Sequence, residues 1–135
     1  MINQYVRVRP LENHEDQRGY SFSVPEEILQ FVGNVNDIHI AAINSNSVRG
    51  NHYHVSKKEF IVVAYSGSWV LAWDTGENTK VNKKQFDGQG AVAIEIEPQT
   101  SHAIKNIGET PLVIVACSSK KYNPANSDTL KRDVL

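Results

Sequence analysis

Residues 49–59 read Arg-Gly-Asn-His-Tyr-His-Val-Ser-Lys-Lys-Glu, and they hold two of the five histidines of the chain. His52 and His54 are two residues apart, so on a β-strand both side chains point to the same face. Glu59 lies an odd number of residues from His52, and it reaches that side only if a bulge or a turn intervenes. The stretch therefore predicts a strand with a pair of imidazoles on one face.

A third histidine, His102, follows a turn that begins at Pro98 and opens a short strand. Imidazole nitrogens and a carboxylate together are common ligands of divalent metals in proteins. We therefore predict a four-ligand metal shell made of His52, His54, Glu59 and His102. The alternative is that these are surface histidines on a loop, or that one of them is a core histidine with a hydrogen-bonded neighbour.

Short runs of β-forming residues, separated by turn residues, make up most of the chain, and this pattern predicts an all-β sandwich or barrel. Only residues 25–32 have helical character, and Gly33 follows them as a stop signal. The final residues, 123–135, are polar and are expected to form an extended tail or a short helix. The predicted strands cover residues Asp37–Ile43, 59–65, Trp69–Asp74, 91–97, 103–106 and 111–117.

Length, charge and composition limit the classes of protein to which the chain can belong. With 135 residues it fits a single domain, residues 1–135, around one core. The net charge of −1 argues against a nucleic-acid or anionic-membrane binder, because such proteins carry a basic surface. The lysine pairs at 57–58 and 120–121 are expected to be solvated turn residues. Cys117 is the only cysteine, so we expect a buried structural thiol and no internal disulfide.

The spacing of the candidate ligands resembles the two signature motifs of the cupin superfamily. This resemblance covers residues 49–106 and implies a jelly roll, the double-stranded β-helix barrel, here with one short N-terminal helix. In that superfamily the residues at the four ligand positions typically bind one divalent metal. The matching motifs are His52-x-His54-x4-Glu59, then Gly67, then Pro98-x3-His102-x3-Asn106.

A narrower resemblance is to cupins that act on nucleotide-linked sugars. The segment 49–53 resembles the Arg-Gly-x-His-Tyr segment of the dTDP-4-dehydrorhamnose 3,5-epimerases, in which that histidine is the general base. Residues 16–20 resemble the Asp-x-Arg-Gly-aromatic segment near the N-termini of those enzymes. Still closer is the C-terminal cupin domain of capsular polysaccharide biosynthesis proteins, where a zinc-bound cupin epimerises a UDP-linked 4-keto sugar. Sugar 3,4-ketoisomerases, with an Arg-Gly-x-His-x-His segment, are also similar.

The resemblance implies an epimerase or isomerase that removes a proton next to the ketone of a nucleotide-linked 4-keto sugar, in surface polysaccharide biosynthesis. His52 is the candidate base, and Tyr53 is the second candidate catalytic residue or a platform for the nucleotide base. Arg18 and Arg49 are candidates for binding the diphosphate, although Arg18 has the alternative of a surface ion pair with Asp16. Trp73 is a candidate for stacking on the nucleotide base.

Two other functions fit the same candidate ligands. The four side chains would serve an iron- or manganese-dependent oxygenase or lyase equally well, because ligand identity alone does not choose among zinc, iron and manganese. A non-catalytic cupin that binds a sugar is the other alternative. Zinc is the first candidate for the metal.

Expectations about location and assembly follow from what the sequence lacks and from the fold. The N-terminus lacks the charged-then-apolar pattern of a signal peptide, and no apolar run approaches transmembrane length. We therefore expect a cytoplasmic protein that binds neither membranes nor nucleic acid. A homodimer is expected, because jelly rolls often cover their exposed strand edges by pairing.

Overall fold

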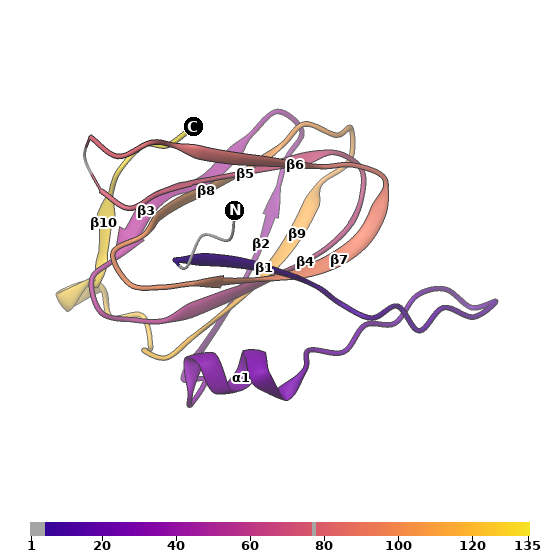
Figure 1. The fold of residues 1–135 in the computed structure, drawn as a ribbon, viewed down its shortest axis with the longest axis horizontal. Helices are drawn as coiled ribbons and strands as arrows, with labels where there is room; N and C mark the ends of the chain where they lie inside the picture. Colours follow the sequence, from indigo (N-terminus) through magenta and orange to yellow (C-terminus); the bar gives the residue numbers. More distant parts are fainter. Residues whose placement is uncertain (1–4, 77) are drawn as a thin grey trace.

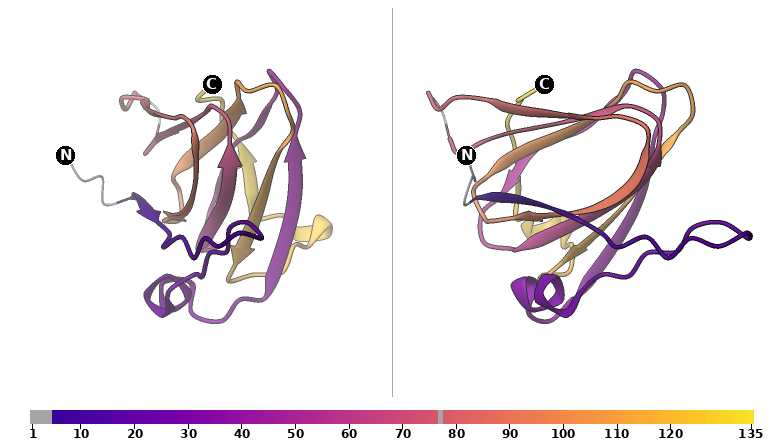
Figure 2. Two further views of the ribbon diagram at one scale, coloured as in Figure 1. Left: turned by 90° about the vertical axis from the view of Figure 1, so that its right-hand side faces the viewer. Right: turned by 45° about the vertical axis from the view of Figure 1, so that its right-hand side comes forward.

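The computed structural model describes residues 5–76 and 78–135, in which two five-stranded antiparallel sheets face each other (Figure 1). The first sheet has the strand order β1-β7-β4-β9-β2, and the second has the order β10-β3-β8-β5-β6. The two sheets curve toward each other into a flattened barrel (Figure 2). The elements are β1 (Val6–Pro10), α1 (Glu26–Val32), β2 (Asp37–Ile43), β3 (Val48–His54), β4 (Glu59–Ser66), β5 (Trp69–Asp74), β6 (Asn82–Phe86), β7 (Gln89–Ile96), β8 (Ser101–Asn106), β9 (Leu112–Ser118), η1 (Pro124–Asn126) and β10 (Thr129–Lys131).

The period-2 alternation of apolar side chains explains why these strands face each other as they do. On β4, Ile61 and Val63 point between the sheets and belong to the main core, whereas Phe60 packs on the outer side. On β5, Trp69 and Leu71 are fully buried in the same core. The inward positions of both sheets therefore form the core of the barrel, and the all-β prediction is confirmed.

Every strand predicted from the sequence is present, with bounds that differ by two residues at most. The strands β1, β6 and β10 were not predicted, because the first is rich in arginine, the second is mostly polar and the third has only three residues. Each of them gains its hydrogen-bonded partner from a strand that the alternation does reveal, namely β7, β5 and β3 respectively. These three segments therefore form strands because they pair with a neighbouring strand, and not because of a strong β-forming pattern in their own sequence.

Residues 123–135 are neither an extended tail nor a final helix. They contain the short 3-10 turn η1 and the strand β10, which pairs with β3. Val134 is buried and packs on Ala72 and Ala103, on the outer side of the second sheet. The polar composition of residues 123–135 gave no strand signal, although this segment packs along the edge of the barrel.

Helix α1 lies under the outer face of the first sheet (Figure 1). Ile28 and Val32 are its buried residues, and they share a cluster with Phe60 and with the half-buried Cys117. Partial burial raises the pKa of the Cys117 thiol, with a smaller contribution from the charge of Glu59. The described part of the chain contains no helix that is both long and apolar enough to cross a membrane.

An arm of residues 13–22 projects from the barrel between β1 and α1 (Figure 2). It is a narrow hairpin, because Asn13 bridges Phe22 and Asp16 bridges Gly19 in antiparallel fashion. This arm carries Arg18 well away from the space between the sheets.

A β-bulge in β3 sets the direction of its histidines. The register with β8 shifts between Gly50 and His52, where Asn51 takes a φ of 54° and Gly50 a φ of 100°. A Cβ atom at Gly50 would lie only 2.7 Å from the carbonyl oxygen of His102, so the close approach of the two strands requires glycine. Beyond the bulge, His52 stands directly opposite His102.

Candidate metal centre and substrate cavity

Three histidines from the second sheet meet at one point on its inner face. His52 and His54 come from β3, and His102 comes from the neighbouring β8. Their ring centroids are 4.9 Å apart for His52–His54, 4.9 Å for His52–His102 and 5.7 Å for His54–His102. One nitrogen from each ring can be chosen so that all three lie within 4.8 Å of one another.

Glu59 reaches the same point from the opposite sheet, at the start of β4. One carboxylate oxygen, Oε2, lies 3.5 Å from Nε2 of His54, and the other, Oε1, lies 3.3 Å from Nε2 of His102. Burial opposes ionisation of Glu59, but its contacts with His102 and His54 outweigh burial and hold its pKa well below the usual range. The site therefore contains a buried carboxylate that remains charged.

The rings of His54 and His102 are oriented by hydrogen bonds on their far sides. Nδ1 of His102 lies 3.0 Å from the carbonyl oxygen of Thr100, to which it donates when it carries the ring proton. Nδ1 of His54 lies 3.1 Å from the hydroxyl oxygen of Thr129. Both Nε2 atoms are buried and lack a hydrogen-bond partner that meets normal geometry. When a ring carries its proton on Nδ1, its Nε2 turns a lone pair toward the carboxylate.

This arrangement fits a divalent metal ion. Buried polar atoms are normally satisfied, and the two unpartnered imidazole nitrogens beside a carboxylate are donor groups that a divalent metal can bind. Tetrahedral ligands at about 2.1 Å from an ion are about 3.4 Å apart, and each imidazole lies at about this separation from a different oxygen of Glu59, His54 at 3.5 Å from Oε2 and His102 at 3.3 Å from Oε1. A nitrogen of His52, within 4.8 Å of the other two, can complete the group. The structure therefore brings together all four predicted ligands.

His52 differs from the other two histidines. Among residues 5–76 and 78–135 its ring makes no hydrogen bond, and it meets the His54 and His102 rings instead. Burial, together with His102 and His54, lowers the pKa of His52 to about 4. Its imidazole is therefore neutral near pH 7 and offers a lone pair.

The four side chains lie at one part of a cavity of about 790 Å³ between the sheets. Cations from three separate segments line it as well: Arg49 from β3, Lys57 from the β3–β4 loop and Lys121 from the segment after β9. Lys57 is only 8% exposed, which corrects its prediction as a solvated turn residue. Further lining residues include Asp37, His39, Ala41, Ile61, Ile104, Ile114, Ser118, Tyr122 and Thr129.

Of the four candidate substrate-binding or catalytic residues outside the ligand set, one lines the cavity and three do not. Arg49 lines the cavity as expected. Tyr53 lies on the opposite face of β3 from His52 and His54, opposite Leu130 of β10, and is not among the lining residues. Trp73 stands opposite His102 and packs against the core without lining the cavity. Arg18 is at the exposed tip of the arm and is paired with Asp16, the alternative given for it.

Sequence reasoning missed several residues that surround the site. Lys57 was predicted to be a surface residue because of its lysine neighbour, although it lies in the short loop that follows the histidine strand. Tyr122 and Thr129 lie in the polar region near the end of the chain, where no periodic pattern marks an element. The one available signal was Asn123-Pro124, which favours a turn that returns the chain to the barrel.

The chain belongs to the family described as the polysaccharide biosynthesis C-terminal domain, whose model matches residues 14–130. A relative is the spore coat polysaccharide biosynthesis protein SpsL of Bacillus subtilis, which is 21% identical over 127 residues. The matched region covers 91% of this chain and 84% of SpsL.

Solved structures of other proteins share the fold, and two of them are nucleotide-bound. The sugar 3,4-ketoisomerase QdtA of Thermoanaerobacterium thermosaccharolyticum, in complex with TDP, has a TM-score of 0.71 at 13% identity, over 97% of this chain and 90% of that chain. A double mutant of the 3'-monoepimerase ChmJ of Streptomyces bikiniensis, in complex with dTDP, has a TM-score of 0.75 at 17% identity, over 95% of this chain and 69% of that chain. The predicted jelly-roll fold is confirmed, and the family match confirms the resemblance to the C-terminal domain of polysaccharide biosynthesis proteins.

Proposed function

We propose that this member of the polysaccharide biosynthesis C-terminal domain family is a metal-containing isomerase or epimerase of a keto sugar linked to a nucleoside diphosphate. The observation that carries the proposal is the convergence of three imidazoles and a buried carboxylate within a cavity that is also lined by three cations. The shared fold with proteins that bind TDP and dTDP supports this class of substrate.

We assign the metal to Glu59, His54 and His102, because these three face one another and the two rings are oriented by other groups. A zinc ion bound there would act as a Lewis acid toward the carbonyl oxygen of the sugar; iron or manganese would fit the same ligands. His52 stands beside these ligands without a hydrogen bond that fixes its ring.

We assign proton transfer to His52. Its neutral ring can take a proton from the carbon next to the ketone, and the electron pair of that C–H bond then moves onto the carbonyl oxygen to give an enolate. Return of a proton to the other face of the same carbon inverts that centre. Where the carbon that lost the proton carries a hydroxyl group, the enolate oxygen can instead be protonated to give an enediol. Loss of that hydroxyl proton and return of a proton to the former carbonyl carbon then move the ketone along the sugar. No electrons enter or leave in either outcome.

The cavity supplies binding groups for the charged part of such a substrate. Arg49, Lys57 and Lys121 line it, and Lys57 is close enough for its charge to contribute to the low pKa of His52. A diphosphate is attracted to such a group of cations, and a guanidinium can bind it through two parallel hydrogen bonds. Tyr122 also lines the cavity, and it replaces Tyr53 and Trp73 as our candidate platform for the nucleotide base.

The test is hydrogen exchange at the sugar in D₂O, followed by NMR, with dTDP- and UDP-linked 4-keto-6-deoxyhexoses and zinc-loaded protein. We expect deuterium to appear next to the ketone with wild type. His52→Asn should keep the metal and lose exchange, whereas His102→Ala should lose both. Binding of the sugar nucleotide without exchange would identify a non-catalytic binder, and oxygen consumption by an iron-loaded protein would identify an oxygenase.

The homodimer and the cytoplasmic location stay predictions. The first is checked by the mass in solution, measured by light scattering. The second is checked by fractionation of the cells that produce the protein.

A further inference from the structure

The ring of His54 is held by a residue that lies 75 positions away in the chain. Oγ1 of Thr129 lies 3.1 Å from Nδ1 of His54, and the two residues face each other in the pairing of β10 with β3. The corresponding partner of His102 is a backbone carbonyl only two residues away, at Thr100. The two buried rings are therefore oriented by very different means.

The direction of this hydrogen bond decides what His54 can bind. For Nε2 to offer its lone pair toward Glu59, the ring proton must sit on Nδ1, where it is donated to the hydroxyl oxygen of Thr129. Outer groups of this kind fix both the tautomer and the angle of a metal-binding imidazole. Without the hydroxyl, the buried Nδ1–H would lose its partner and the ring would be free to turn.

The strand that carries Thr129 has only three residues and pairs with β3 alone. So short an edge strand has little stability of its own. The segment on its N-terminal side is fixed by Asp128, whose carboxylate accepts hydrogen bonds from the backbone N–H groups of Ser56 and Lys57 and from the Ser56 hydroxyl. The residue that precedes Thr129 is therefore fixed by hydrogen bonds, which restrict the position of Thr129.

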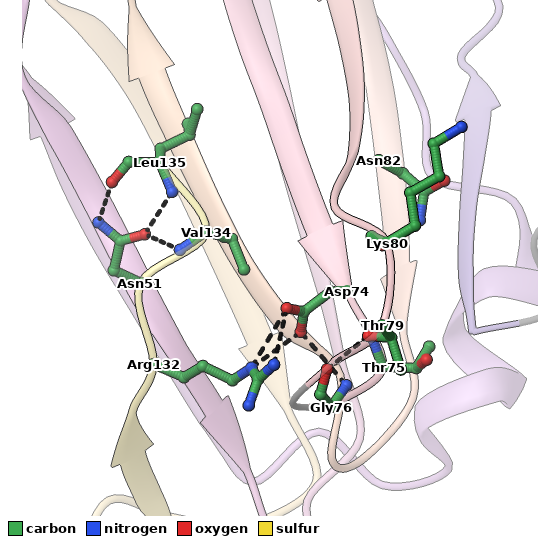
Figure 3. Close-up of polar contacts among 10 residues, drawn as sticks. All are labelled: Asn51, Asp74, Thr75, Gly76, Thr79, Lys80, Asn82, Arg132, Val134 and Leu135. Atoms are coloured by element: carbon green, nitrogen blue, oxygen red, sulfur yellow. Dashed lines mark hydrogen bonds and ion pairs between the residues drawn. The ribbon is translucent and has the colours of Figure 1, made fainter.

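The segment on the C-terminal side of β10 is fixed twice more (Figure 3). The guanidinium of Arg132 donates to both carboxylate oxygens of Asp74, at 3.0–3.2 Å. The side chain of Asn51, in the bulge next to His52, accepts hydrogen bonds from the N–H groups of Val134 and Leu135 and donates to the carbonyl of Leu135. Residues 128–135, which we call the C-terminal strap, therefore bind the same strand that presents two candidate ligands.

We propose that Thr129 is a positioning residue for the metal ligand His54, and that docking of the C-terminal strap and binding of the metal stabilise each other. This inference rests on the metal centre of the proposed function, but not on the reaction or the substrate. Coupling between two such events is reciprocal. The metal must therefore strengthen the docking of the strap by the same factor by which the docked strap strengthens metal binding.

The test of Thr129 is the affinity for zinc alone, measured by competition with a chromophoric chelator on untagged protein. Thr129→Val should weaken zinc binding about tenfold, the lower end of the usual effect of losing an outer-shell partner. Thr129→Ser restores a hydroxyl and should stay within about twofold of wild type. Leu130→Ala is the matched control, since Leu130 lies on the same strand with its side chain on the other face and 46% exposed.

The test of coupling uses Arg132, which holds the strap through its hydrogen bonds to Asp74. Arg132→Gln should weaken zinc binding severalfold by loosening the strap, and zinc should slow hydrogen exchange of the backbone amides of β10 in wild type. Equal zinc affinity in folded Thr129→Val and wild type would overturn the role of Thr129. Unchanged exchange of β10 with zinc would overturn the coupling. A wild type that binds no zinc would overturn the inference together with the metal centre, whereas zinc binding without sugar exchange would leave it standing and remove only the reaction.

Discussion

The inside of the barrel has one region filled by aromatic rings and another lined by polar side chains. In the first, Trp69 and Phe86 stack with centroids 4.1 Å apart, and Tyr65 meets Trp69 edge-on at 5.5 Å. In the second, inward positions of the same two sheets carry His102 and Glu59. In both regions the alternation of each strand points every second side chain inward, whether that side chain is apolar or polar.

The difference lies in the chemistry of the buried atoms that have no hydrogen-bond partner, which include the indole Nε1 of Trp69 in the first region and imidazole nitrogens beside a carboxylate in the second. The aromatic region excludes water and stabilises the fold through apolar contact. The polar region leaves Nε2 of His54 and of His102 without hydrogen-bond partners, an arrangement that disfavours the folded state. One region thus contributes stability, and the other holds the unpaired groups to which we assign the proposed metal.

Removing the largest ring of the aromatic region should have the largest effect on stability. Trp69 is fully buried, so Trp69→Ala should lower the free energy of unfolding by about 3–5 kcal/mol, because it leaves a cavity. Chemical denaturation of metal-free protein measures this change. A loss below about 1 kcal/mol would mean that the two regions do not differ in their contribution.

Removing the metal should affect only the polar region. When zinc is present at about 100 times its dissociation constant, a chelator should lower the free energy of unfolding by about 2.7 kcal/mol. The thermal unfolding midpoint, with and without chelator, measures this. In His102→Ala the chelator should have no effect, and a midpoint that still falls there would place the zinc elsewhere.

The bulge that joins the two strands of the polar region should respond to a single methyl group. Gly50→Ala adds a Cβ atom 2.7 Å from the His102 carbonyl oxygen at a φ of 100°, so we expect a loss of about 1–3 kcal/mol. Zinc affinity should fall as well, because the added methyl group pushes β3 away from the backbone of the candidate ligand His102. As a control, Gly88→Ala also has a positive φ but meets no atom within 4 Å, and it should leave zinc affinity unchanged.

The smallest effect is a pH dependence of the metal-free protein. His52 has a pKa of about 4 when folded and close to 6.5 when unfolded, so the unfolded chain binds more protons between these values. The free energy of unfolding should therefore fall as the pH is lowered from about 7 to about 5, above the range in which carboxylates titrate. His52→Asn should flatten this dependence in urea denaturation. An equal slope in the variant would assign the dependence to another group.

Sequence patterns predicted the part of the molecule that depends on local rules. The two-residue spacing of His52 and His54 fixed their common face, and the motif spacing brought in Glu59 and His102 from other strands. Strict alternation also places Tyr53 on the outer face, so the strand itself excluded that candidate from the cavity. The position of Trp73 depends on how its ring packs against the core, which periodicity does not describe.

The remaining parts of the site arise from contacts between distant polar segments. Lys57 is buried because its loop is held by Asp128, and Thr129 reaches His54 because a three-residue strand adds to an edge. Neither contact produces a periodic pattern in the sequence, because each depends on a few hydrogen bonds between segments that are far apart in the chain. The short polar segment that begins with the Asn123-Pro124 turn could follow many other courses over the barrel without a change in its sequence pattern.

The hydrogen bond between Thr129 and His54 also has a consequence for the order of folding. The two residues are separated by 75 positions, so closing this contact requires the intervening chain to lose much of its freedom first. A partly folded chain can hold the β3–β4 loop and still lack an oriented His54. Tight metal binding should therefore be among the last properties to appear during refolding, and its rate of appearance would report completion of the whole barrel.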